Sequence, residues 1–143
     1  MAHKLHFRGA KLILSARNED RLMELAAELG GGAQVLPLDV TNLEAVQQAA
    51  ASVGAIDGLI YNAGIYVPMR AIRWDTKAAL GMCDVNFMGA MRVLGEIVPK
   101  FVERGAGDIT IVGSLAAHRG LPAAIGYGAS KAALLSLAET MRH

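Results

Sequence analysis

The chain has 143 residues, of which 53% are hydrophobic and 19% are charged, and this composition excludes a disordered protein and suits a single globular domain. Lys and Arg number 14 against 13 Asp and Glu, for a net charge of +1, so the charge balance gives no indication of binding to nucleic acid or to an anionic membrane. The single cysteine, Cys83, excludes an internal disulfide framework and is typical of a cytoplasmic protein, and no apolar run approaches the roughly 18 residues that span a bilayer.

The first predicted elements are a strand and a helix. Lys11–Ser15 is a short apolar run that suits a buried strand. Glu19–Leu29 carries apolar residues at helical spacing, with Asn18 at the N-cap position. Three consecutive glycines, Gly30–Gly32, then end the predicted helix.

The pattern repeats in the next segment. Gln34–Asp39 predicts a second strand. Glu44–Val53 predicts a second helix, for which Thr41 is the expected N-cap because Glu44 follows it at the capping-box spacing. Ile56–Tyr61 predicts a third strand, and an irregular segment over residues 65–74 follows it.

The second half predicts two longer helices around one strand. Thr76–Arg104 has a long helical pattern, which we expect Pro99 to kink or shorten. Asp108–Gly113 is rich in β-branched residues and predicts a fourth strand, a loop follows over residues 114–125, and Gly126–Arg142 predicts the last helix. Strands that alternate with helices predict an α/β fold with a doubly wound parallel sheet.

The most informative residues are Tyr127 and Lys131, four apart on the last predicted helix. Residues at this spacing share one helix face, so the ammonium lies beside the phenol. A phenol exchanges protons near neutral pH only where its phenolate is stabilised, and a neighbouring ammonium does this. The alternative is an ordinary surface pair, because such a spacing also arises by chance.

Other polar residues lie where strands are expected to end. Ser114 follows the fourth predicted strand, and Asn62-Ala63-Gly64 follows the third. Ligands of open α/β sheets bind outside the carboxyl ends of the strands, so these residues are candidates for a site. Ser114 could instead only cap a turn. Asn86, inside the long helix, is expected to be exposed or to bond a specific partner.

Together these segments resemble the short-chain dehydrogenase/reductase family of nicotinamide-dependent oxidoreductases, which have a Rossmann-like fold. The resemblance covers essentially the whole chain. Its pieces, in chain order, are Ser15-Ala16-Arg17, Asp39-Val40, Asn62-Ala63-Gly64, Val85-Asn86, Gly113-Ser114 and Tyr127-Gly128-Ala129-Ser130-Lys131.

The resemblance implies four catalytic residues. Tyr127 is the acid/base, and Lys131 stabilises its phenolate and binds the nicotinamide ribose. Ser114 orients the substrate oxygen, and Asn86 holds a water that continues a proton relay through Lys131. One departure from the family pattern is Tyr61, which stands where the family commonly has the first Asn of Asn-Asn-Ala-Gly.

The resemblance also implies a cofactor site. Its expected residues are Ser15, Arg17, Asp39, Val40, Asn62, Ala63, Gly64, Tyr127 and Lys131. NAD-preferring members place an acidic residue after the second family strand, where this chain has Ala16 followed by Arg17. A guanidinium without a carboxylate favours NADP(H) over NAD(H), because it attracts the 2′-phosphate. The alternative is that Arg17 is a solvated side chain near a helix start.

Two parts of the family pattern are missing from the chain. No strand with a Gly-rich turn precedes Lys11–Ser15, so we expect about 25 residues to be missing between Lys4 and Leu5. The C-terminal part of the family fold is missing as well. Residues 1–143 are therefore interpreted as one Rossmann-like domain with an incomplete sheet, whose missing strand belongs in the middle.

We expect an NADP(H)-dependent oxidoreductase that interconverts a small-molecule carbonyl and an alcohol. Its expected partners include a second copy of the chain, in a homodimer or homotetramer formed through the helices at 76–104 and 126–143. No metal site is expected, because the four histidines lack ligand-like spacing. The alternatives are a truncated, non-catalytic remnant of the family that acts by association, and a flavodoxin-like domain, which leaves Tyr127, Lys131 and Ser114 unexplained.

Overall fold

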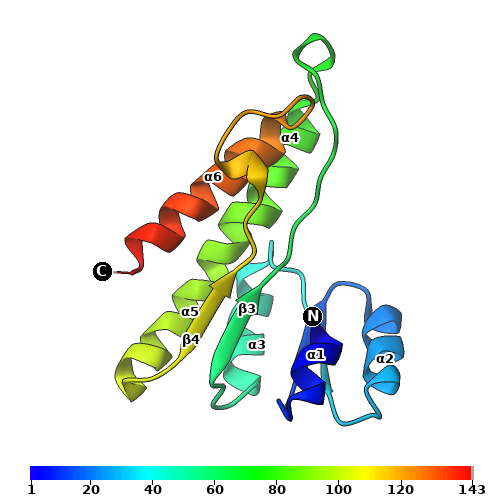
Figure 1. Cartoon of the computed structure of the whole chain (residues 1–143), viewed down its shortest axis with the longest axis vertical. Coiled ribbons are helices and arrows are strands. Elements are labelled where there is room, and N and C mark those ends of the chain that lie inside the picture. Colours follow the sequence, from blue (N-terminus) through cyan, green and yellow to red (C-terminus); the bar gives the residue numbers. More distant parts are fainter. Residues whose placement is uncertain (143) are drawn as a thin grey trace. The chain divides into compact units, whose positions relative to one another are not determined.

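The computed structural model describes residues 1–142, and the chain divides into two compact units, Met1–Gly54 and Ala55–His143. Each unit contains a pair of parallel strands with helices attached (Figure 1). The predicted α/β fold with parallel strands is confirmed. The sheet is incomplete, because the strands form two separate pairs, β1–β2 and β3–β4, rather than one continuous sheet.

The unit Met1–Gly54 has a small apolar core. Its elements in chain order are α1 (Ala2–Phe7), β1 (Ile13–Ala16), α2 (Glu19–Glu28), β2 (Gln34–Pro37) and α3 (Leu43–Ser52). The strands pair in parallel from Ile13 opposite Gln34 to Ala16 opposite Pro37. Leu14 of β1 is buried with Leu22 and Ala26 of α2, so the apolar face of α2 covers the strand as its spacing predicts. The segment expected to be missing would lie within α1, and its absence stays a prediction.

The helix starts in this unit confirm one predicted cap and correct the other. Asn18 caps α2, and its side chain accepts from Arg21 N at 2.9 Å. The prediction that Thr41 caps the next helix is wrong, since Asn42 caps α3 and accepts from Ala45 N at 3.1 Å. Thr41 is engaged elsewhere, because both its N–H and its hydroxyl donate to the carboxylate of Asp39, at 2.9 and 2.8 Å.

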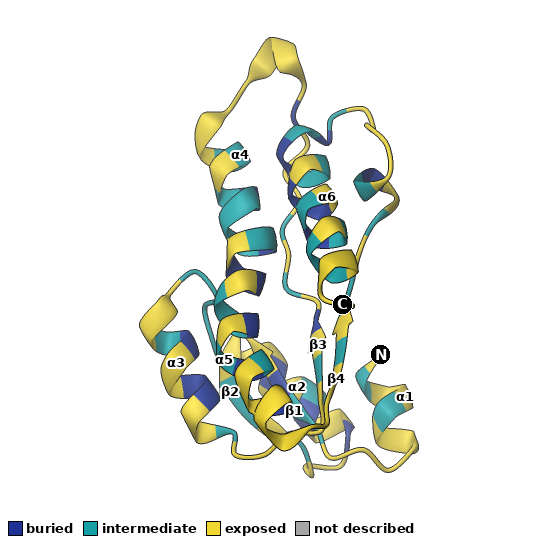
Figure 2. Cartoon of the chain, turned by 90° about the vertical axis from the view of Figure 1, so that its left-hand side faces the viewer, coloured by how far each residue is buried: buried dark blue, intermediate teal, exposed yellow. Residues whose placement is uncertain are grey.

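The second unit is built around a parallel strand pair and long helices. Its main elements are β3 (Gly58–Tyr61), α4 (Thr76–Cys83), the π-helix η2 (Asp84–Met88), α5 (Gly89–Arg104), β4 (Asp108–Ile111) and α6 (Ile125–Thr140), with 3₁₀ turns η1 (Ala71–Arg73) and η3 (Leu115–Ala117). The strand register runs from Gly58 opposite Asp108 to Tyr61 opposite Ile111. α4 and α6 lie side by side (Figures 1 and 2).

The long helix predicted over Thr76–Arg104 is interrupted differently from the prediction. Pro99 lies inside α5 and does not shorten it, since the helix continues to Arg104. Ile97 and Phe101, on either side of Pro99, are buried, and this packing holds the helix together despite the missing donor. The irregularity lies instead at η2, where Gly89 N bonds to Asp84 O in a π turn. No helix of residues 1–142 is both long and apolar enough to cross a membrane.

Candidate active site

Tyr127 and Lys131 lie on the first turns of α6, as the sequence predicts. Lys131 is 4% exposed, and its Nζ donates to the carbonyl of Val112 at 2.8 Å. Val112 directly follows β4, so this bond ties α6 to the carboxyl end of that strand. The same Nζ is 5.8 Å from the centre of the Tyr127 ring. A buried ammonium thus lies beside a phenol that is only partly buried, and the surface-pair alternative does not describe this arrangement.

Asn86 is fully buried in the π-helix and joins three parts of this unit. Its Oδ1 accepts from Ile65 N at 2.7 Å, and its Nδ2 donates to Ile65 O at 3.0 Å. The second amide proton goes to Ser130 Oγ at 2.9 Å, and Ser130 Oγ donates to the carbonyl of Tyr127 at 2.8 Å. The amide therefore connects the segment after Asn62-Ala63-Gly64 to the helix turn that carries Tyr127.

Gly64 lies against the same group of residues. A Cβ atom added to Gly64 would lie 3.3 Å from Asn86 Oδ1 and 3.8 Å from Lys131 Nζ. The structure therefore brings Gly64, Asn86 and Lys131 together. Asn62 is exposed and Ala63 is half-buried, so the turn leaves surface free beside the buried residues.

Tyr61 connects the end of β3 to the π-helix that carries Asn86. Its buried hydroxyl donates to the carbonyl of Val85, next to Asn86, at 2.7 Å. Burial raises the pKa of the Tyr61 phenol well above its usual range, so the group is a permanent donor. In the sequence Tyr61 is noticeable only as a departure from the family pattern. Its hydrogen bond to Val85 has no local sequence signal, because the two residues are 24 positions apart.

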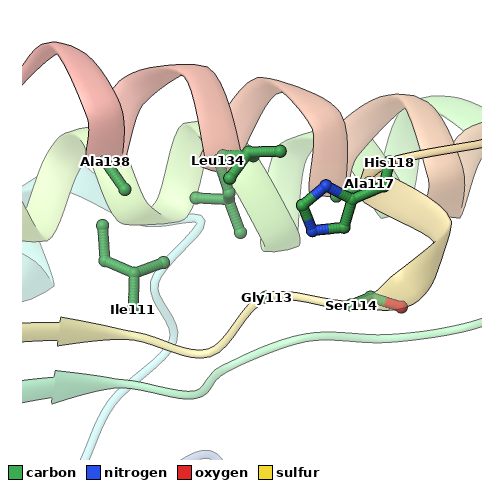
Figure 3. Close-up of a pocket in the computed structure, with 8 residues that line it drawn as sticks. Ile111, Gly113, Ser114, Ala117, His118, Leu134 and Ala138 are labelled. Atoms are coloured by element: carbon green, nitrogen blue, oxygen red, sulfur yellow. The ribbon is translucent and has the colours of Figure 1, made fainter.

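Ser114 lies after the carboxyl end of β4, at the start of η3. Its Oγ accepts from Ala116 N at 3.2 Å, so the capping role that the sequence left open is present. Ser114 and His118 also line a cavity of about 70 Å³ between the β4 segment and α6, where Ile111 points towards Ala138 and Leu134 (Figure 3). This cavity is far smaller than the roughly 300 Å³ or more of typical ligand pockets.

The remaining candidates lie in the unit Met1–Gly54. Ser15 is on β1, Arg17 follows it, and both are exposed. Asp39 and Val40 follow β2 and are half-buried. Because β1 and β2 are parallel neighbours, these four residues lie at or near one edge of their sheet.

Among residues 1–142 no group of three or more His, Cys, Asp or Glu side chains is placed to hold a metal ion.

Comparison with known proteins agrees with this arrangement of motifs. A family model described as short chain dehydrogenase matches residues 1–143. The chain belongs to the short-chain dehydrogenase family. In the structure, Ser114 follows β4, Asn86 lies in the π-helix η2, and Tyr127 and Lys131 lie on α6.

Two curated relatives and one solved structure illustrate the similarity within the short-chain dehydrogenases. An uncharacterized oxidoreductase of Myxococcus xanthus is 34% identical over 142 residues, covering 94% of this chain and 56% of the relative. An 11-beta-hydroxysteroid dehydrogenase-like protein of Arabidopsis thaliana is 35% identical over 153 residues, covering 99% and 49%. The closed form of serine dehydrogenase complexed with NADP+ has a TM-score of 0.93 at 32% identity, covering 99% and 59%. The chain spans about half the length of these curated relatives.

Proposed function

We propose that this chain carries the catalytic centre of an NADP(H)-dependent oxidoreductase that interconverts a carbonyl compound and an alcohol. The observation that carries the proposal is the buried ammonium of Lys131 beside Tyr127, 5.8 Å from the ring centre. A Lys ammonium near the phenol is the arrangement that we infer for a tyrosine acting as the acid/base.

Each polar residue of the centre then has a role. In the reductive direction the Tyr127 hydroxyl gives its proton to the carbonyl oxygen, and in the oxidative direction it takes the alcohol proton. Lys131 is held by Val112, and we assign it a second contact, to the nicotinamide ribose. We assign the next step of the proton relay to Lys131 and a water that donates to an oxygen of Asn86, because both amide protons of Asn86 are already used for Ile65 and Ser130. Ser114 accepts from Ala116 N, which leaves its own hydroxyl proton available for the substrate oxygen.

Candidate residues for a nicotinamide dinucleotide lie in each of the two units, and we propose them as the part of the cofactor site that this chain contributes. When bound, the dinucleotide supplies or accepts the hydride at the reacting carbon. Gly64 has no side chain, so its backbone can lie close to Asn86 Oδ1 and Lys131 Nζ, and Asn62 in the same turn is exposed and accessible to a ligand. Exposed Arg17, with Ala16 in place of an acidic residue, suits a 2′-phosphate, and Ser15, Asp39 and Val40 complete the proposed adenosine side. The similarity to a serine dehydrogenase complexed with NADP+ supports this preference.

We further propose that the protein forms a homodimer or homotetramer through the helices at 76–104 and 126–143. Large apolar side chains are exposed on α4 and α5, among them Leu80 at 65% and Val102 at 73%. A helix face of a partner copy would cover these side chains and remove their apolar surface from water. Association without catalysis would not require the hydrogen-bonded group around Asn86 and Lys131, so we favour the enzyme over the non-catalytic remnant.

The test is the oxidation of NADPH by the full-length protein with a panel of ketones and aldehydes. We expect turnover with at least one of them, a higher kcat/KM with NADPH than with NADH, and a loss of about 10²–10⁴-fold in kcat for Tyr127→Phe. Lys131→Met should lower kcat and raise the KM for NADPH, whereas Lys77→Met, on an exposed part of α4, serves as the matched control. A Tyr127→Phe protein that kept more than a tenth of wild-type turnover would contradict the proposal.

A further inference from the structure

The ring of Tyr66 lies against the ring of Tyr127. The two ring centres are 5.0 Å apart, and the planes are tilted by 56°. This is a favourable geometry for an aromatic pair. Tyr66 has no part in the proton relay, yet it is the side chain in ring contact with the tyrosine that the proposed function places at the substrate oxygen.

The segment that carries Tyr66 is fixed at alternate residues. Both backbone groups of Ile65 are bonded to the Asn86 amide. Val67 N donates to Met82 Sδ at 3.3 Å, and Met69 N donates to the carbonyl of Ala123 at 2.8 Å. The side chain of Tyr66 therefore projects from an anchored backbone, and its position beside Tyr127 does not depend on a mobile loop.

The partner of this segment has an unusual backbone conformation. Ala123 has a φ of +59°, in the left-handed region that a residue with a side chain seldom adopts. Its carbonyl accepts from Met69 N and lies 3.5 Å from the Tyr66 hydroxyl. Strained residues of this kind persist where their surroundings hold them, often at functional sites. Here the carbonyl of Ala123 helps to hold the Tyr66 segment beside the start of α6.

The residues that flank Tyr66 in the chain are uncharged, and several apolar side chains near it in sequence or beside Ala123 are partly exposed. Half of Tyr66 is exposed, Val67 is 41% exposed, and Leu121, two residues before Ala123, is 37% exposed. Residues 62–69 carry no charged side chain. Part of the Tyr66 side chain thus remains exposed beside the Tyr127 ring.

Resting on the proposed function, we propose that Tyr66 is a specificity-determining residue that forms an aromatic wall of the substrate site. It selects carbonyl compounds that carry a flat aromatic group on the carbonyl carbon. In such a compound the aromatic ring lies directly beside the oxygen that contacts Tyr127, so it reaches the exposed part of Tyr66. A puckered saturated ring of the same size cannot stack in this way.

The experiment compares acetophenone with cyclohexyl methyl ketone, which differ in the aromaticity of one six-membered ring. The kcat/KM for each is measured with NADPH in the full-length wild type, Tyr66→Phe and Tyr66→Leu. Phe7→Leu, an exposed aromatic residue on α1, is the matched control. We expect the ratio of acetophenone to cyclohexyl methyl ketone to fall about three- to tenfold in Tyr66→Leu and to be retained in Tyr66→Phe and Phe7→Leu.

The ratio within each variant cancels the overall activity of that variant, and the intrinsic reactivities of the two ketones cancel when the ratios of two variants are compared. If Tyr66→Leu does not fold, as judged by circular dichroism, Tyr66→Met takes its place. A ratio within twofold of wild type in the folded variant, or an equal fall in Phe7→Leu, overturns the inference. So does a wild type that reduces neither ketone. The proposed function is judged separately, by turnover of the wider panel and its loss in Tyr127→Phe.

Discussion

Lys131 and Asn86 are polar groups whose burial makes them depend on specific partners. Removing a charge or an amide from water costs several kcal/mol unless hydrogen bonds compensate. Lys131 has the Val112 carbonyl, and the Asn86 amide has both backbone groups of Ile65 and the Ser130 hydroxyl. Their positions are therefore fixed, which is what a proton-transferring centre requires.

The hydrogen bond from Tyr61 to Val85 allows the contribution of one such buried contact to stability to be measured. In Tyr61→Phe the Val85 carbonyl loses its phenol partner while the ring packing is kept. We expect the free energy of unfolding to fall by about 1–3 kcal/mol, seen as a lower midpoint of urea unfolding at unchanged slope.

The control for this variant is Tyr66→Phe. Its hydroxyl belongs to a half-exposed side chain and is 3.5 Å from its acceptor, so we expect a change within about 0.5 kcal/mol. Equal losses of unfolding free energy in the two variants would contradict the expectation that the buried Tyr61 bond contributes more to stability than the exposed Tyr66 contact.

At the scale of elements, the approach of α4 to α6 is set by a residue without a side chain. A Cβ at Gly126 would lie 2.9 Å from Met82 Cε and 3.0 Å from Ala79 Cα. Ala79 Cα is a backbone atom, so it cannot move away by a change of rotamer as the Met82 side chain can. Gly126 therefore permits the close packing that positions the next residue, Tyr127, and the π turn at η2 places Asn86 against the same helix.

Gly126→Ala is expected to destabilise the protein by about 1–3 kcal/mol, because the overpacked helix pair must separate. Alanine is the better helix former by about 1 kcal/mol, so helix propensity alone predicts the opposite sign. Gly81→Ala, on α4 with open space around its Cβ position, is the matched control and should be neutral or stabilising. Thermal unfolding measures both, and a stabilised Gly126→Ala would refute the close-packing argument.

At the scale of the whole molecule, the candidate residues are divided between the two units. Ser15, Arg17, Asp39 and Val40 belong to Met1–Gly54, and the catalytic candidates belong to Ala55–His143. The junction between β1 and α2 contains no glycine, and the glycine run Gly30–Gly32 follows a helix rather than a strand. The Gly-rich turn that would bind a pyrophosphate through backbone amides is thus missing from residues 1–143.

Residues 1–143 expressed alone are therefore expected not to bind NADPH at concentrations up to about 1 mM. An exposed charge contact at Arg17 contributes about 0–1 kcal/mol, whereas millimolar binding needs about 4 kcal/mol. Isothermal titration calorimetry measures this, with the serine dehydrogenase that has been solved in complex with NADP+ as the positive control. Micromolar binding by residues 1–143 would contradict both this argument and the segment expected to be missing between Lys4 and Leu5.

The sequence itself determined the order and type of the strands and of the main helices from Lys11 onward, whereas it predicted neither α1 nor the π-helix η2. Each predicted strand overlaps an observed one, and the helix cap at Asn18 and the placing of Tyr127 and Lys131 on one helix are confirmed. These features depend on interactions between residues a few positions apart, such as hydrophobic spacing and capping. The family follows from the same motifs, and the model match over residues 1–143 confirms it.

Tertiary structure alone decided which polar groups meet. The bonds of Tyr61 to Val85, of Asn86 to Ile65 and of Lys131 to Val112 join residues 24, 21 and 19 positions apart. Such contacts exist only once strands and helices have packed, and no local pattern encodes them. The wrong cap at Thr41 has a local cause instead, because Asp39, two residues before it, accepts from both its N–H and its hydroxyl. At Pro99 the tertiary structure decides again, because the helix continues to Arg104 with Ile97 and Phe101 buried on either side of the proline.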